Sequence, residues 1–73
     1  MRCFFHLEYR NCVLRDETGE NFPNIEQAIA YAVGVARELA RNRPDRVSVG
    51  QRILVTDVGG IALFRVPLRF ARV

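Results

Sequence analysis

The chain has 73 residues, with 11 basic and 8 acidic side chains, and a formal net charge of +3 at pH 7. This length allows one hydrophobic core, so we expect residues 1–73 to form a single small domain and we exclude a second domain. The single histidine, His6, excludes a metal site built from two histidines, and no apolar run approaches the ~20 residues of a membrane-spanning helix.

A first β-hairpin is predicted at the start of the chain. Arg2–Tyr9 is rich in aromatic residues and alternates between two faces, as a half-buried strand does. If Arg10-Asn11 forms a two-residue turn, the chain returns as Cys12–Arg15 and Tyr9 lies opposite Cys12. The face that we expect beneath a helix is apolar throughout and comprises Phe5, Leu7, Tyr9, Cys12 and Leu14.

The two cysteines do not indicate a disulfide. In this register Cys12 faces Tyr9, and Cys3 lies far along the other strand, so both are expected to be buried thiols in a reducing compartment. The short apolar run at the N-terminus is interrupted by His6 and Glu8 and is not typical of a secretion signal, so we expect a cytoplasmic protein. Without a disulfide or a metal, a homodimer is the natural remaining source of stability for so short a chain.

The segment Asn24–Asn42 has a sustained helical period. Asn24 followed by Gln27 is typical of a helix N-cap. Pro44 disfavours helical backbone at the residue before it, so the helix should end within Leu39–Asn42. The apolar stripe expected to face the sheet comprises Ile25, Ala28, Ile29, Ala32, Val33, Ala36, Leu39 and Ala40.

A second hairpin is predicted after the helix. Pro44–Gln51 should be a loop, with a short extended piece at residues 47–49, and Arg52–Asp57 and Ile61–Val66 should be strands joined by a tight turn. A two-residue Gly59-Gly60 loop would place Ile53 opposite Val66, and a three-residue loop would place it opposite Phe64. In either register one face of this hairpin holds Ile53, Val55, Ala62, Phe64 and Val66.

Together these elements predict an α+β domain of ββαββ order, an antiparallel sheet of two hairpins with one central amphipathic helix packed on one face. Residues 16–21 form a polar turn before the helix, and residues 67–73 form a basic tail that adds an edge strand or stays mobile. The sheet face opposite the helix holds apolar side chains without a cover, which indicates burial by a partner. The residues expected at that interface are Phe4, His6, Leu54, Thr56 and Leu63.

Basic charge is concentrated in the second half of the chain. Residues 1–36 have a net charge of −2, residues 37–73 have a net charge of +5, and every basic residue is an arginine. Arginine suits phosphate groups, so nucleic acid is an alternative partner, although no recognition helix or aromatic-basic interleaving supports it. The arginines expected to form this surface are Arg37, Arg41, Arg43, Arg46 and Arg52.

Catalysis is the third class of function that we consider. His6 could act as a base beside Glu8 or Arg15, but no serine or threonine has an evident base arranged with it. The acidic residues within 16–20 lack the spacing of a calcium loop, and Gly59-Gly60 precedes no helix and so forms no phosphate loop. We therefore expect no catalytic residue, no cofactor and no metal.

Motifs spread over nearly the whole chain carry a resemblance to one protein family. They are Phe4-Phe5-His6-Leu7, Asp16-Glu17-Thr18-Gly19-Glu20, Ala36-Arg37-Glu38-Leu39, Ile53-Leu54-Val55-Thr56-Asp57, Gly60, Leu63 and Val66-Pro67. Their combination resembles a family of short proteins, catalogued as a domain of unknown function, that is common in rhizobia and related Alphaproteobacteria. The resemblance implies a small α+β domain in a bacterial cytoplasm and implies no activity. The chain departs from the family pattern at two places. The first turn is Arg10-Asn11 where relatives tend to have Asp-Gly or Asn-Gly, and a basic tail follows Pro67.

The sequence therefore predicts a small interaction module without catalytic activity. We expect it to associate with a second copy through the sheet face that the helix leaves bare, and to meet a protein partner that the sequence does not identify.

Overall fold

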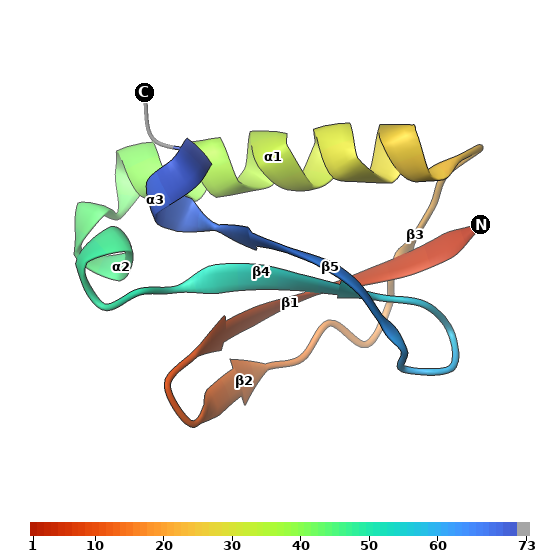
Figure 1. Ribbon diagram of the computed structural model, residues 1–73, viewed down its shortest axis with the longest axis horizontal. Helices are drawn as coiled ribbons and strands as arrows, with labels where there is room; N and C mark the ends of the chain where they lie inside the picture. Colours follow the sequence, from red (N-terminus) through yellow and green to blue (C-terminus); the bar gives the residue numbers. More distant parts are fainter. Residues whose placement is uncertain (72–73) are drawn as a thin grey trace.

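The computed structural model describes residues 1–71, in which α1 lies across one face of a twisted antiparallel sheet (Figure 1). In chain order the elements are β1 (Arg2–Tyr9), β2 (Cys12–Leu14), β3 (Glu20–Asn21), α1 (Ile25–Asn42), α2 (Pro44–Ser48), β4 (Arg52–Thr56), β5 (Ala62–Pro67) and α3 (Leu68–Ala71). The predicted α+β class is confirmed, but the ββαββ order with one helix is incomplete because β3, α2 and α3 add to it. None of the helices in residues 1–71 is long and apolar enough to cross a bilayer.

The sheet has the strand order β2-β1-β4-β5, and β3 pairs with the start of β1. The two central strands, β1 and β4, are antiparallel, with Phe5 opposite Val55. In the first hairpin Tyr9 pairs with Cys12, which confirms the predicted register. The end of the predicted polar turn is therefore a short strand, β3, held against β1 by the pair Arg2 and Asn21.

The second hairpin follows the register of the two-residue loop over most of its length. Ile53 lies opposite Val66, and a bulge between Val55 and Thr56 then places Ala62 opposite Thr56. Ile61 lies outside β5, contrary to the predicted strand bounds. The cause is the carboxylate of Asp57, whose Oδ1 accepts the N–H groups of Gly59 (2.9 Å) and Ile61 (3.0 Å) and so draws Ile61 into the turn.

α1 approaches the sheet through a row of alanines. Ala28, Ala32, Ala36 and Ala40 recur every four residues and are its buried residues. Side chains this small let the helix backbone lie close to the surface beneath it, since the distance between packed elements depends on the side chains at the contact. The prediction that Ile29 faces the sheet is wrong: its side chain is 40% exposed, because the contact is a narrow row and Ile29 lies one position to its side.

Three aromatic rings fix the first turns of α1 to the sheet. The ring centroids of Phe5 and Tyr31 are 5.0 Å apart, and those of Phe5 and Phe22 are 5.6 Å apart, both in edge-on geometry. Phe22 and Tyr31 complete the cluster at 5.3 Å. The predicted cap is confirmed, since Asn24 Oδ1 accepts the N–H of Gln27 at 2.9 Å.

The first hairpin extends beyond the cover of α1, which is a correction to the predicted buried face. α1 contacts β1 through Tyr31 and Phe5 and otherwise packs on β4, β5 and the two short helices, away from the edge strand β2. Cys3 is fully buried, but Leu14 is 69% exposed and Cys12 is exposed too. Both thiols are free, so the prediction of no disulfide is confirmed and the prediction of two buried thiols is wrong for Cys12.

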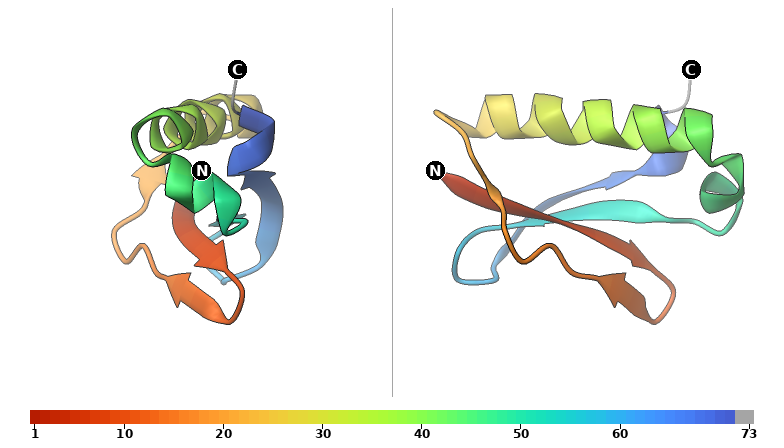
Figure 2. Two further views of the ribbon diagram at one scale, coloured as in Figure 1. Left: turned by 90° about the vertical axis from the view of Figure 1, so that its left-hand side faces the viewer. Right: turned by 180° about the vertical axis from the view of Figure 1, so that it is seen from behind.

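Residues 44–48 form a short helix instead of the predicted loop with an extended piece at 47–49. Pro44 occupies its first turn, where the fixed φ of proline suits a helix, and Asp45 places negative charge there. α2 lies at the end of the molecule where α1 ends and the chain turns toward β4 (Figure 2).

The residues after Pro67 turn back against α1 as α3, which differs from the predicted edge strand. Leu68 is fully buried, and its N–H donates to the carbonyl of Gln51 at 3.1 Å. Burial of this one apolar side chain explains why the chain leaves the sheet edge at Pro67. The remainder of the predicted basic tail, residues 72–73, lies outside the described residues.

The variant Leu68→Ala should lower the free energy of unfolding by about 2–5 kcal/mol, because it removes one of the largest fully buried side chains. Phe70→Ala in the same helix is the control: Phe70 is exposed, and its loss should change the free energy by less than about 0.5 kcal/mol. Urea denaturation measures both, and equal effects would contradict the docking of α3.

Candidate functional site

The sheet face away from α1, which we call the far face, holds the five residues predicted as an interface. Phe4 and Leu54 are half-buried, and Leu63 is exposed. His6 and Thr56 are buried, although no helix within residues 1–71 covers this face. Only part of the predicted interface is therefore accessible to a partner.

His6 is buried by contacts within the chain. Its Nδ1 accepts the backbone N–H of Asp16 at 3.0 Å, which places the ring proton on Nε2. Nε2 then donates to Thr56 Oγ1, 3.0 Å away. Because both ring nitrogens are engaged, the geometry gives His6 a structural role in joining the 16–19 loop to β1 and β4.

The Asp16 carboxylate holds this loop in place. Its Oδ2 accepts the N–H of Phe5 at 3.1 Å, and its Oδ1 accepts the N–H groups of Thr18 and Gly19 at 3.0 and 3.1 Å. Partial burial opposes ionisation, but the N–H groups of Phe5, Gly19 and Thr18 outweigh it and lower the pKa of Asp16 below its usual value.

Gly19 allows the loop to lie directly on the sheet. Its φ is +76°, and a Cβ at this position would lie 2.9 Å from the Phe4 ring and 3.0 Å from the Cys3 carbonyl oxygen. Only glycine combines that backbone conformation with so close a contact.

One end of the far face carries a charged cluster. Glu8 Oε1 accepts from Arg52 Nε at 2.7 Å and from Arg65 Nε at 3.0 Å. The hydrogen bond from Arg65 lowers the pKa of Glu8, against the effect of burial and together with that from Arg52. The far face is thus apolar at Phe4, Leu54 and Leu63 and charged at Glu8.

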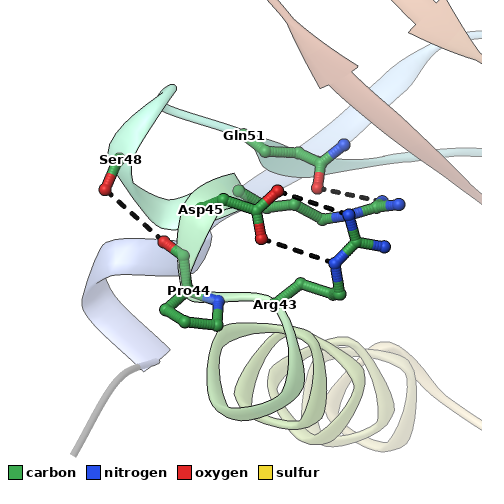
Figure 3. Close-up of polar contacts among 6 residues, drawn as sticks. Arg43, Pro44, Asp45, Ser48 and Gln51 are labelled. Carbon is green, nitrogen blue, oxygen red and sulfur yellow. Dashed lines mark hydrogen bonds and ion pairs between the residues drawn. The ribbon is translucent and has the colours of Figure 1, made fainter.

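The predicted arginine surface is divided by the fold. Arg52 belongs to the charged cluster on the far face, and Arg43 binds Asp45 at 3.3 Å beside α2 (Figure 3). Arg46 Nη1 donates to Gln51 Oε1 at 3.4 Å (Figure 3). The two remaining members, Arg37 and Arg41, are exposed and form no ion pair within residues 1–71.

A groove of about 450 Å³, which we call the hairpin groove, lies between the first hairpin and the residues that follow α1. Leu7 and Tyr9 of β1 line one wall together with the three residues of β2. The other wall is formed by Arg43, Asp45, Arg46, Val49 and Gln51. Sequence reasoning missed this groove, and the one available signal was the helical start at Pro44-Asp45, which places these residues together.

A protein-family profile matches residues 2–69, which is nearly the whole chain. The chain belongs to the DUF6894 family, described as a domain of unknown function. The predicted membership of such a family is confirmed, and its distribution among rhizobia stays a prediction. No curated protein and no solved structure matches the chain.

The loop contacts of Asp16 predict an acid-dependent contribution to stability. A carboxyl whose pKa is lowered in the folded state stabilises the fold above its unfolded pKa, about 3.9, and loses that contribution as the pH falls through its folded pKa. Asp16→Asn should lower the free energy of unfolding by about 1–3 kcal/mol at neutral pH, and the difference from the parent chain should shrink as the pH falls below the unfolded pKa of about 3.9.

Glu17→Gln removes the same charge from an exposed position of the same loop and should change the free energy by less than about 0.5 kcal/mol. Urea denaturation across this pH range checks both variants. A loss in Asp16→Asn that stays constant with pH would show that the ionised carboxylate is not the stabilising group.

Proposed function

We propose that this domain is a small interaction module without catalytic activity that associates with a second copy through the far face. The observation that carries the proposal is the set of apolar side chains on that face, the exposed Leu63 and the half-buried Phe4 and Leu54. Ile61, two residues before Leu63, is also exposed, at the end of the β4–β5 turn. Exposed apolar residues grouped on one face are typical of protein contacts.

The composition of the core supports a need for such a contact. The largest fully buried side chains are Ile53, Leu68, Val55 and Cys3, and the rest of the buried apolar set is alanine. A domain of this size buries only about 60% of its unfolded surface, so further burial between copies would add stability where the core supplies little.

The arrangement of the far face suits a two-fold symmetric contact. Such a contact uses the same patch on both copies, with an apolar centre and a polar rim. Phe4, Leu54 and Leu63 supply the centre, and the paired charges around Glu8 supply the rim. A standard interface buries about 800 Å² of each partner, which is about one sixth of the 4862 Å² of accessible surface here. His6 and Thr56, which are buried within one chain, are not part of the interface that we propose.

The side chains that could act in catalysis form hydrogen bonds within the chain, which supports a role other than catalysis. His6 has both ring nitrogens engaged, and Ser48 Oγ donates to the carbonyl of Pro44 (Figure 3). We also propose a reducing compartment such as the cytoplasm, because Cys12 is exposed as a free thiol.

Nucleic-acid binding is the weaker alternative. It is favoured by Arg37 and Arg41, which lie four residues apart on α1, are exposed and have no ion pair within residues 1–71. Two such arginines are a small surface for phosphate groups, since Arg52 bonds Glu8 on the far face, and Arg43 and Arg46 lie apart from them in the hairpin groove.

Sedimentation equilibrium tests the proposed self-association. The parent chain should sediment as a dimer at micromolar concentrations, and Leu63→Glu should weaken dimerisation by at least about tenfold, because it places a charge in the apolar centre. Ile29→Glu is the matched control, since Ile29 on α1 is 40% exposed and Leu63 is 37% exposed. A parent chain that stays monomeric at all concentrations, or equal weakening by both variants, would rule out the far face as the contact.

A further inference from the structure

The hairpin groove has hydrogen-bond donors at one end. Gln51 lies there with 5% of its surface exposed, and its Oε1 accepts from Arg46. Its amide nitrogen points away from that bond (Figure 3). No buried polar side-chain atom within residues 1–71 is left without a partner, so this amide group is open to water or to a ligand.

Two guanidinium groups lie at the same end. Arg46 uses only Nη1 in its bond to Gln51, and Arg43 holds Asp45 through contacts of 3.3 and 3.4 Å, which are long for charged partners. The guanidinium of Arg43 lowers the pKa of Asp45, so this acceptor stays ionised and occupied. With two cations and one anion, this end of the groove carries a net positive charge and is suited to an anionic ligand.

The remainder of the groove is apolar. Leu7, Tyr9 and Leu14 line the hairpin side, and Val49 lines the side of α2. Leu14 is 69% exposed without a ligand, so an apolar group in the groove would remove it from water. Its volume of about 450 Å³ lies within the range of small-molecule pockets, about 300–1,000 Å³.

We propose that the hairpin groove binds a small amphipathic carboxylate, with its carboxylate at Gln51, Arg46 and Arg43 and its hydrocarbon chain along Leu7, Leu14 and Val49. A carboxylate can accept hydrogen bonds from guanidinium groups and offsets the net positive charge at this end of the groove. A peptide laid along the groove fits less well, since its backbone amides would meet an apolar wall and lose their hydrogen bonds to water.

Titration of the full chain with octanoate, followed by two-dimensional proton–nitrogen NMR, tests the proposal. Octanoate should shift the backbone signals of the groove and the side-chain NH₂ signals of Gln51, and leave those of Gln27, the other glutamine, unchanged. Octanol, with the same tail and no charge, should bind at least about tenfold more weakly.

Three variants sharpen the test. Arg46→Gln should weaken octanoate binding at least about tenfold by removing a cation, and Leu14→Glu should do so by adding an anion to the groove. Val58→Glu is the control for Leu14→Glu, since Val58 is 75% exposed in the β4–β5 turn and lies outside the groove. Unchanged dispersion of the NMR spectrum would show that each variant is folded.

Three results would overturn the proposal: no shift of the Gln51 side chain with octanoate, equal binding of octanol, or equal weakening by Leu14→Glu and Val58→Glu. Binding of an acidic peptide such as acetyl-Leu-Glu-Leu-amide in place of octanoate would also overturn it, in favour of a protein ligand. The titration detects binding in monomer or dimer, so its outcome is independent of the proposed self-association.

Discussion

The close approach of α1 to the sheet determines most of this structure. Alanine at every fourth position, from Ala28 to Ala40, brings the helix backbone to the sheet without large side chains between them. The contact is stable because other groups close its two ends: Phe5, Phe22 and Tyr31 at the start of α1, and Leu68 of α3 near its end. The core is therefore narrow, and few large side chains are fully buried.

A narrow core explains why two surfaces remain open. α1 covers β4 and β5 but not β2, so the inner side of the first hairpin forms one wall of the hairpin groove. On the far face the 16–19 loop covers His6 through Asp16 and lies against Phe4 through Gly19, and the rest of that face carries Leu54, Leu63 and the charged cluster at Glu8. The far face and the hairpin groove thus remain accessible for the same reason, the narrow contact of α1 with one side of the sheet.

The sequence predicted the features that depend on local chemistry. The bounds of α1 follow from Asn24 and Pro44, and the register of the first hairpin follows from its two-residue turn. The strand order was not predictable, because nothing in the sequence of either hairpin determines which of its two strands pairs with the other hairpin.

The features that sequence reasoning missed depend on contacts between distant residues. The burial of His6 depends on the backbone of Asp16, and the exposure of Leu14 depends on where α1 crosses the sheet. The hairpin groove required the hairpin and the residues after α1 to be placed side by side, and no local pattern specifies that placement. The assignment of Ile29 to the core failed because hydrophobic spacing does not distinguish a contact made by alanines from one made by larger neighbours.

Comparison of two helix variants tests the packing of α1 most directly. Ala32→Leu should lower the free energy of unfolding by about 1–3 kcal/mol or more, because the added side chain has no space between α1 and the sheet. Ile29→Ala should lower it by less than about 1 kcal/mol, because Ile29 lies beside the contact. A larger loss from Ile29→Ala than from Ala32→Leu, measured by urea denaturation, would show that α1 faces the sheet with its larger side chains and would contradict this account.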